Sequence, residues 1–225
     1  MGVTPEELAQ TYPLLYHMAD AQSWESIRKH GLLSTSALLD LFEVNGKERA
    51  EIESRRRPER VVIEHSAYGH AVIRDQKPLI ESKLAKSLRG CTLREWYYLL
   101  NKHVFFWLTK ERLHTLLCAR EYRDEAHAVL TLDTLTLVKR YEDQITLSPM
   151  NSGNTQPIAH PRGPETFQKM QDYPFKERAG RGDYYQVVEL AIEGGVEVVD
   201  SIVSVDLMQC AGTDIKILSS LFRRA

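Results

Sequence analysis

The 225-residue chain is poor in cysteine, and its positive and negative charges nearly cancel. Its three cysteines, Cys91, Cys118 and Cys210, are widely separated and form no CxxC pair. This pattern predicts reduced thiols that pack as small hydrophobic side chains in a cytosol-like compartment. A formal net charge of −2 excludes a uniformly basic nucleic-acid-binding surface, although it leaves room for local basic patches.

Other familiar sequence signals are also missing. No apolar run approaches the length of a membrane span, and the N-terminal stretch MGVTPEELAQTYPLL lacks the layout of a signal peptide. We therefore expect a cytoplasmic protein without a membrane partner. The motifs GxGxxG, GxxxxGK with Ser or Thr, and GxSxG are absent, which removes the common nucleotide-binding loops and the hydrolase nucleophile turn. The histidines show no HxxxH, HExxH or HxH spacing, so no metal site is predicted.

The composition favours one folded domain over residues 1–225, because 43% of the chain is hydrophobic and 27% is charged. Strands are predicted at 14–18, 60–65, 70–75, 104–108, 127–133, 184–193 and 196–208, the last two joined as one long β-hairpin by Gly194-Gly195. Helices are predicted after a cap at Asp20, over 36–57, from Pro78, after a Thr92–Glu95 capping box, after Thr109, and over 134–141. Strands and helices do not alternate strictly, so we predict an α+β fold.

Residues 148–163, SPMNSGNTQPIAHPRG, do not suit a regular helix or strand, because they contain three prolines and two glycines. A loop of this length is usually either functional or disordered. Its neutral polar side chains suit the edge of a base, a ribose or an amide: Asn151, Ser152, Asn154, Thr155 and Gln156. Arg162 adds a cation for a phosphate, and the prolines lower the entropy cost of ordering. We predict an ordered binding loop.

Glu189 lies in the middle of the apolar stretch QVVELAI. A carboxylate flanked by apolar residues along a strand needs a partner or a chemical role. Two interpretations stay open: an exposed glutamate on a half-solvated sheet, or a catalytic carboxylate held on a rigid element.

Arg74, Asp75 and Gln76 end a predicted strand just before Lys77-Pro78. They suit the wall of a cleft, although an Asp75 that caps the next helix and pairs with Arg74 explains the pattern equally well. His17 and Trp107 lie among apolar residues, and a place in the core is the default expectation for both. In the charged run 47–60, ion pairs along a solvated helix are favoured over phosphate contacts by Arg55, Arg56 and Arg57.

Three stretches resemble ADP-ribosyltransferase-type domains, most closely the DarT-type enzymes that modify DNA. LLYHMADAQSWESIRKHGLLS (14–34) resembles the opening strand with Tyr-His and the helix that ends in Ile-x-x-x-Gly-Leu. VFFWLTKERLHTLL (104–117) is similar to the apolar middle strand and short helix, and YYQVVELAIEGGVEVVDSIV (184–203) to the late strand with the catalytic glutamate. The arginine that usually follows the middle strand is not matched in context by Lys110 or Arg112.

The resemblance implies a fold of split, mostly antiparallel β-sheets around a cleft with surrounding helices. It also implies an enzyme that transfers ADP-ribose from NAD to DNA, phage DNA included, in a toxin or anti-phage defence role. Glu189 would stabilise the oxocarbenium ion, and His17 would hold the nicotinamide ribose. Arg74 would hold phosphate, and Asp75 would activate the acceptor or bind a ribose hydroxyl. The remaining substrate-binding set would be Gln76, Trp107, Asn151, Ser152, Asn154, Thr155, Arg162 and Tyr185.

Two other functions stay open. A DNA glycosylase would need no NAD, would flip a modified base into the cleft, and would use water as the acceptor at Asp75 or Glu189. This alternative explains the RDQ and NSGNT segments better. A non-catalytic nucleotide-binding module would keep its activity after Glu189→Gln.

Overall fold

The structure is a computed structural model that describes residues 2–180 and 186–224. Its helices are α1 (Pro5–Thr11), α2 (Trp24–His30), α3 (Thr35–Leu41), α4 (Gly46–Ser54), α5 (Glu81–Ser87), α6 (Leu93–Asn101), α7 (Lys110–Leu117), α8 (Thr134–Tyr141), α9 (Phe175–Ala179), and the short η1 (Glu142–Gln144) and η2 (Pro164–Thr166). Its strands are β1 (Leu14–Asp20), β2 (Leu32–Leu33), β3 (Val61–His65), β4 (Gly69–Ile73), β5 (His103–Trp107), β6 (His127–Asp133), β7 (Ile145–Ser148), β8 (Gln168–Lys169), β9 (Glu189–Glu193), β10 (Gly195–Val196), β11 (Ile202–Ala211) and β12 (Asp214–Arg223).

The main sheet has the order β12-β11-β6-β1-β5-β9-β7-β8, and its described pairs are all antiparallel. Two small antiparallel sheets, β10-β2 and β3-β4, accompany it. The mixture of helices with mostly antiparallel strands confirms the predicted α+β class.

The main sheet is nearly divided between β1 and β5. These strands share the single register pair Tyr16↔Trp107, whereas β1 pairs with β6 along its whole length from Leu14↔Asp133 to Asp20↔His127. Away from that pair, β1 and β5 lack the ladder that holds other neighbours together. The sheet therefore consists of two halves joined at one point.

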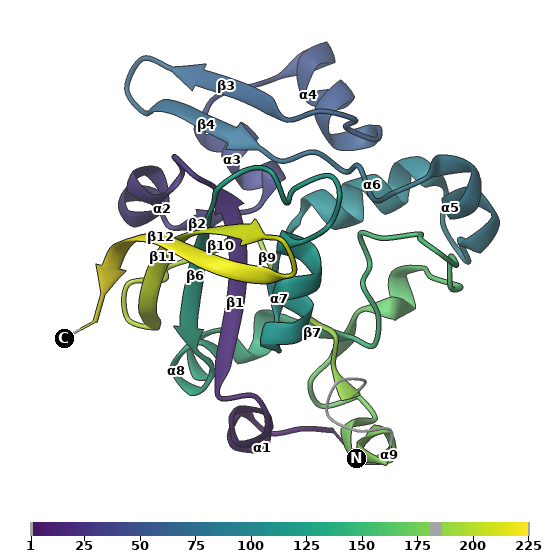
Figure 1. Cartoon of the computed structure of the whole chain (residues 1–225). Helices are drawn as coiled ribbons and strands as arrows, with labels where there is room; N and C mark the ends of the chain where they lie inside the picture. Colours follow the sequence, from purple (N-terminus) through teal and green to yellow (C-terminus); the bar gives the residue numbers. More distant parts are fainter. Residues whose placement is uncertain (1, 181–185, 225) are drawn as a thin grey trace.

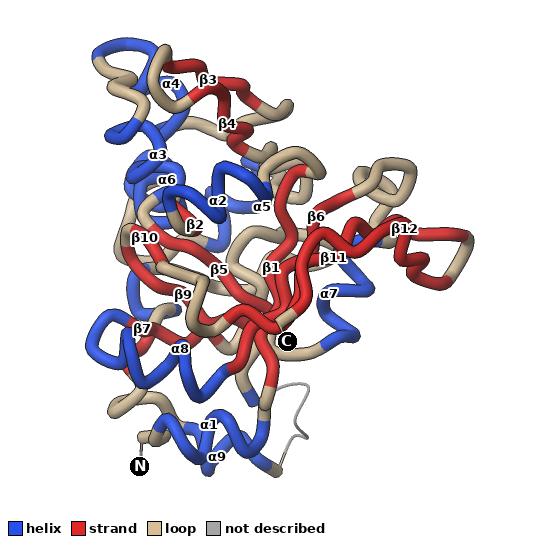
Figure 2. The backbone as a smooth tube through the Cα atoms, turned by 90° about the vertical axis from the view of Figure 1, so that its left-hand side faces the viewer, coloured by secondary structure: helices blue, strands red, loops and turns tan. Residues whose placement is uncertain are grey.

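Separate hydrophobic clusters cover the two faces of the main sheet, and the larger one includes residues from both halves. One face of the sheet packs against α1, α2 and α8, and the other packs against α7 through Leu113 and Leu117. Helices α5 and α6 form a third cluster around Trp96. A fourth cluster joins α3, α4 and the β3–β4 hairpin, which lie at the end of the molecule opposite α1 and α9 (Figure 1 and Figure 2).

The local sequence signals predicted many elements correctly. The strands at 14–18, 104–108 and 127–133 are present, and so are the β3–β4 hairpin and the helix over 134–141. The Thr92–Glu95 capping box forms with both of its reciprocal hydrogen bonds, and the Thr109 side chain caps α7. In each case the local sequence pattern is sufficient to predict the element.

The predictions that depended on long-range pairing were wrong. The hairpin predicted over 184–193 and 196–208 is not formed by its described residues, because β9 pairs with β5 and β7, whereas β11 pairs with β6 and β12. The edge strand β12 was not predicted at all. The sequence of a strand indicates that the segment can join a sheet, but it does not indicate which strand will lie beside it.

Three helix predictions also need correction. The helix expected over 36–57 is divided into α3 and α4, because Glu43 between them and Gly46 at the start of α4 adopt positive φ angles. The helix expected from Pro78 begins at Glu81, after a turn in which the N–H of Leu79 donates to the carbonyl of Gln76. Asp20 does not cap α2, and its side chain instead accepts from the N–H of Gln22.

The cysteines differ from the expected reduced thiols. Cys118, just after α7, is disulfide-bonded to Cys210 of β11, with their Cα atoms 5.2 Å apart. Cys91 is free and half-buried. The 92-residue separation of the bonded pair hid their proximity, which arises only when α7 packs against the sheet.

Candidate functional site

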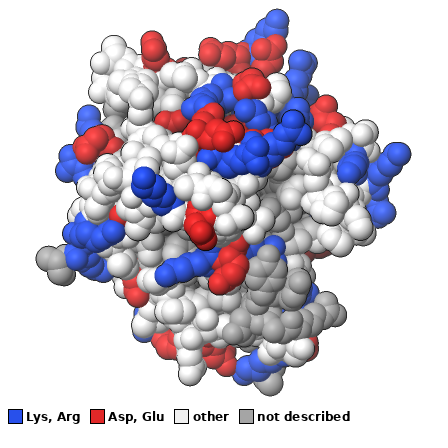
Figure 3. All heavy atoms as spheres, in the orientation of Figure 1, with Lys and Arg blue, Asp and Glu red and all other residues white. Residues whose placement is uncertain are grey.

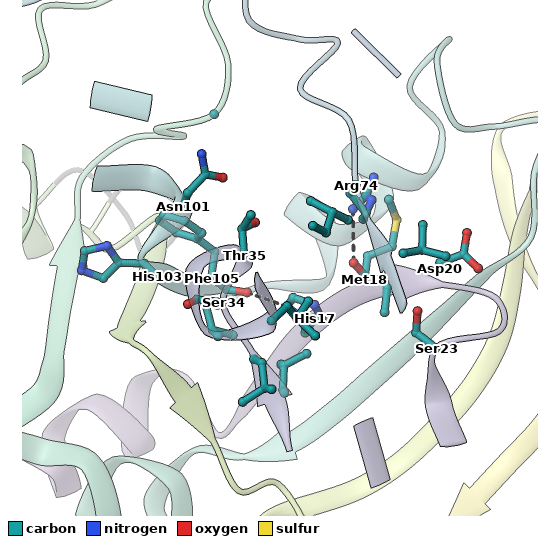
Figure 4. A pocket seen from close by; sticks show the side chains of 18 of the residues that line it. His17, Met18, Asp20, Ser23, Ser34, Thr35, Arg74, Asn101, His103 and Phe105 are labelled. Atoms are coloured by element: carbon teal, nitrogen blue, oxygen red, sulfur yellow. Dashed lines mark hydrogen bonds between the residues drawn. The ribbon is translucent and has the colours of Figure 1, made fainter. Parts of the chain in front are cut away.

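A cavity of about 320 Å³ lies where β1 and β5 separate. Its walls come from β1, β4 and β5, from the segment after β4, from the start of α3, and from the loop after β7. Figure 4 shows Arg74 reaching the Met18 carbonyl of β1 and His17 reaching the Phe105 carbonyl of β5. The His17 contact bridges the separated strands β1 and β5, and the Arg74 contact joins the segment after β4 to β1.

Glu189 is the most deeply buried carboxyl group that lines the cavity, with 4% of the residue exposed. It lies in register with Trp107 of β5, which is itself in register with Tyr16 of β1. At the usual spacing of neighbouring strands, this row brings the β1 backbone to within about 10 Å of the Glu189 backbone. Glu189 is therefore held on a central strand, and its burial excludes the exposed interpretation.

The environment of Glu189 makes its proton easy to gain or lose at neutral pH. Burial raises the pKa of its carboxyl group to about 7. The backbone N–H of Ser152, which donates to Oε2 at 3.0 Å, acts in the opposite direction, as do the charges of Arg112 and Arg162. Both the acid and the carboxylate are thus populated near pH 7.

His17 is half-buried and lines the cavity, so it is not a core residue. Its Nδ1 lies 2.8 Å from the Phe105 carbonyl oxygen, an acceptor that fixes the proton on Nδ1. Burial lowers the pKa of His17 to about 4, and the nearby charge of Arg74 acts in the same direction. The ring is therefore neutral at pH 7, with Nε2 available as an acceptor.

Arg74 and Asp75 form a network with Tyr122, a residue that sequence reasoning missed. The Tyr122 hydroxyl donates to Oδ1 of Asp75 at 2.7 Å, and the Arg74 guanidinium lies 4.8 Å from the centroid of the Tyr122 ring. The N–H of Lys77 donates to the same Oδ1 at 3.0 Å, which leaves Oδ2 without a donor from the described residues. All three side chains of the network line the cavity.

Gln76 lines the cavity but is occupied by Arg57. Its Oε1 accepts from the Arg57 N–H at 3.0 Å, and its own N–H donates to the Arg57 carbonyl at 2.7 Å. The buried Arg57 side chain donates to the Arg74 and Ile52 carbonyls and to Oδ1 of Asn101. Arg57 is thus used internally, and neither the predicted solvated helix nor a phosphate contact describes it.

The loop 148–163 divides into residues that face the cavity and residues that hold the loop in place. Asn151 and Ser152 line the cavity, whereas Asn154, Thr155 and Arg162 do not. The Thr155 hydroxyl is buried against the segment after β4, where it accepts from the Ile80 N–H at 2.8 Å and donates to the Pro78 carbonyl at 3.3 Å. The Asn154 side chain accepts from the Gln156 N–H within the loop.

The structure thus brings eight predicted residues to one cavity: His17, Arg74, Asp75, Gln76, Trp107, Asn151, Ser152 and Glu189. Trp107 also packs with Tyr16 and Leu113, so it serves the core as well as the cavity wall. Predicted contacts of Asn154, Thr155 and Arg162 with a ligand are not supported by their positions. Tyr185 and Tyr184 lie outside the described residues.

The residues that sequence reasoning missed lack local signals. Tyr122 lies in the turn between α7 and β6, and only tertiary packing brings it to Asp75. Ser34 caps α3 and also lines the cavity. Its position at the end of the 14–34 stretch, shortly after α2, was a signal that could have identified it. Asn101 ends α6 and meets Arg57 from 44 positions away.

Among residues 2–180 and 186–224, no group of three or more His, Cys, Asp or Glu side chains is arranged to hold a metal ion. Within the same part of the chain, no helix is both long and apolar enough to cross a membrane.

Comparison with known proteins gives one match. No curated protein and no solved structure matches the chain. A family model, described as a family of unknown function (DUF7002), matches residues 13–203, which include β1, the cavity, the loop 148–163 and Glu189. Because this match spans most of the chain, the protein belongs to the DUF7002 family.

Proposed function

We propose that the protein transfers ADP-ribose from NAD to DNA. The observation that carries this proposal is Glu189, a buried carboxyl group on a central strand that shares one cavity with the neutral ring of His17. The resemblance of the 14–34 and 184–203 stretches to ADP-ribosyltransferase domains assigns the same two residues to the two sides of the nicotinamide ribose.

Glu189 suits the cleavage of a glycosidic bond to a cationic leaving group. The bond between C1′ of the ribose and the nicotinamide nitrogen breaks, its electron pair stays on nicotinamide, and the ribose passes through an oxocarbenium-like state. A carboxylate in a buried site stabilises that positive charge strongly. The positive nicotinamide ring of bound NAD also favours the ionised form of Glu189, whose pKa of about 7 allows the proton to leave near neutral pH.

His17 suits a positioning role in this reaction. Its Nδ1–H is engaged by the Phe105 carbonyl, so its orientation is fixed and Nε2 presents a lone pair. A ribose hydroxyl would donate to that nitrogen. Because the pKa of His17 is lowered to about 4, this acceptor persists throughout the pH range in which Glu189 ionises.

Asp75 suits the second proton transfer, from the acceptor. Two donors orient Oδ1, and Oδ2 is left to take a proton from the attacking amine or hydroxyl as the new bond to C1′ forms. Tyr122 would then act as a positioning residue for Asp75, and Arg74 would meet a phosphate group of either substrate.

A DNA base would be the acceptor, stacked near Trp107 and read by the Asn151 side chain. On the face shown in Figure 3, acidic and basic side chains are interspersed rather than gathered into one basic surface. We therefore expect recognition of a single exposed base at the cavity mouth, with a modest contribution from the phosphate backbone.

One observation favours the DNA glycosylase as a second candidate. Of the described residues that line the cavity, the arginine and lysine side chains are those of Arg57 and Arg74, and Arg57 is used internally. The Arg74 guanidinium, with a single positive charge, would balance only one of the two negative charges on the phosphates of NAD. In a glycosylase, Asp75 would instead position water against C1′ of a flipped nucleotide.

One experiment separates these functions. Purified protein is incubated with single-stranded and double-stranded DNA, modified phage DNA included, with and without NAD, and nucleosides and free bases are analysed by mass spectrometry. An ADP-ribose adduct that requires NAD and Glu189 supports the transferase. Free base and abasic sites without NAD overturn it in favour of the glycosylase, and NAD binding without any product overturns it in favour of a binding module.

A further inference from the structure

Arg162 lies in the loop 148–163, which the sequence pattern predicts to bind a ligand. It is buried, with 3% of the residue exposed, and it does not line the cavity. Its Nη1 donates to the carbonyls of Ser152 at 3.0 Å and Asn154 at 2.8 Å, with a longer contact of 3.5 Å to the Asn151 carbonyl. Its Nε donates to the His160 carbonyl at 3.1 Å.

The segment gathered by Arg162 delivers a hydrogen-bond donor to Glu189. β7 ends at Ser148, which is in register with Glu189, and the chain then turns so that the Ser152 N–H reaches Oε2 of Glu189 at 3.0 Å. Arg162 therefore holds the carbonyl of the same residue whose N–H meets the carboxylate. Ser152 itself is buried, with 1% of the residue exposed.

The loop around Arg162 is anchored on two sides. The backbone N–H of Arg162 donates to the Ser87 carbonyl at 3.0 Å, and the Arg162 carbonyl accepts from the Arg89 N–H at 2.8 Å. Thr155 binds the loop to residues 78–80 as described above. Between these anchors, the guanidinium of Arg162 donates to the carbonyls of residues 151, 152 and 154.

We propose that Arg162 is a positioning residue that clamps residues 151–154 and thereby holds the Ser152 N–H and a positive charge against the Glu189 carboxylate. A catalytic consequence of this clamp rests on the proposed function of the cavity, whereas its effect on Glu189 does not. The planar guanidinium reaches several carbonyls at once in a fixed geometry, which a lysine ammonium does not reproduce.

The other groups around Glu189 do not duplicate the clamp. The charge of Arg112 on α7 also acts on the pKa of Glu189. The residues in register on the neighbouring strands, Trp107 on β5 and Ser148 on β7, carry no charge. His17 and Asp75 line the same cavity on its other walls.

The test measures Glu189 directly in the full chain, without substrate. The side-chain carboxyl carbons of glutamate are labelled with carbon-13, the Glu189 signal is assigned by its loss in Glu189→Gln, and its titration is followed by NMR in the wild type, Arg162→Gln, Arg162→Lys and Arg89→Gln. Arg89 is a matched control, because its exposed side chain also donates to two carbonyls, of Lys86 and Leu88, but does not line the cavity. Arg89→Gln keeps the backbone N–H that anchors the loop. Amide hydrogen exchange of residues 151–154 is measured on the same samples.

We expect the pKa of Glu189 to rise above 7 in Arg162→Gln, because both the charge and the Ser152 donor are lost, while Arg89→Gln matches the wild type. Arg162→Lys should keep the charge but still speed the exchange of the Ser152 amide by about tenfold or more. An Arg162→Gln protein in which the midpoint stays or falls overturns the proposal, even if NAD binding proves correct. Conversely, if the Glu189 titration midpoint rises in Arg162→Gln but the protein does not use NAD, the clamp is supported and only the proposed function is rejected.

Discussion

Two of the carboxyl groups that line the cavity, those of Glu189 and Asp75, come from different regions of the chain and have different environments. β9 holds Glu189 in a buried row of the main sheet, with one backbone donor on Oε2 and a pKa raised to about 7. The segment after β4 holds Asp75 at the cavity wall, with Tyr122 and Lys77 both donating to Oδ1.

This difference in environment assigns different chemistry to two similar groups. Glu189 changes charge with little cost at neutral pH and can respond to a cationic ligand. Asp75 is oriented by two donors, which suits a base that must meet an acceptor in one geometry. Environments that separate two carboxyl groups in this way are typical of paired acid, base and charge-stabilising roles.

The largest expected effect is the loss of activity in Glu189→Gln. The substitution removes the charge that stabilises the oxocarbenium ion, and we expect kcat to fall on the order of a thousandfold or more while the cavity keeps its shape. Product formation is measured by mass spectrometry, with Glu193→Gln at the exposed end of β9 as the matched control. Wild-type turnover by Glu189→Gln would remove Glu189 from the mechanism.

Although Glu189→Gln should lose activity, we expect it to be more stable than the wild type at high pH. In the wild type, the folded state keeps a proton on Glu189 between pH 4.5 and 7 that the unfolded state has lost, so the free energy of unfolding falls as pH rises through this window. Glu189→Gln should therefore gain up to roughly 3 kcal/mol over the wild type above pH 7, and no comparable gain at pH 4.5. Urea unfolding at pH 4.5 and 8 tests this, and equal differences at both values would contradict the buried environment of Glu189.

A smaller loss of activity is expected for Asp75→Asn. The asparagine still accepts from Tyr122 and Lys77 but does not take a proton from the acceptor, so kcat should fall on the order of a hundredfold with little change in the KM for NAD. Hydrolysis of NAD without DNA should be affected less than transfer to DNA. If both reactions fall equally, Asp75 acts on NAD and not on the acceptor.

Tyr122→Phe tests how Asp75 is oriented, because it removes one hydrogen-bond donor from the Asp75 carboxylate and keeps the ring beside Arg74. We expect about a tenfold loss of transfer to DNA and an unchanged affinity for NAD. Tyr98→Phe is a suitable control, since the exposed Tyr98 hydroxyl contacts only Arg94 among the described residues. An unaffected Tyr122→Phe would mean that Lys77 alone orients Asp75.

The last expected effect concerns stability on the acid side of the pH range. The folded state keeps His17 neutral down to about pH 4, whereas the unfolded state binds a proton below about 6.5, so the free energy of unfolding falls as pH drops through this window. His17→Asn keeps a donor for the Phe105 carbonyl and should lose less stability between pH 6.5 and 4. Denaturant titrations at a series of pH values measure the slope, and identical slopes would place a charged histidine in the cavity.

The sequence predicted the parts of this site that depend on local pattern. A glutamate inside QVVELAI, a histidine at the end of the first strand and three polar residues after β4 were each unusual in their own segments, and all of them line the cavity. The polar loop was also recognised, although its residues divide between the cavity and the interior.

What the sequence did not predict depends on contacts between distant segments. A cation in a polar loop predicts a phosphate ligand at Arg162, but the partners of its side chain are carbonyls of its own loop. The partner of β9 depends on which strand lies beside it in the sheet, and the Cys118–Cys210 bond depends on the docking of α7. No local signal marks Tyr122 as the partner of Asp75.

The most direct test of the central claim is calorimetric titration of NAD into the wild type and Glu189→Gln near pH 6.5, in two buffers with different ionisation enthalpies. Our account predicts that the wild type binds NAD and releases a fraction of a proton, because the cationic ring drives ionisation of a carboxyl group with a pKa of about 7, and that Glu189→Gln binds without this release. No binding, or binding with equal proton release in both proteins, would contradict the assignment of Glu189 to the nicotinamide end of NAD.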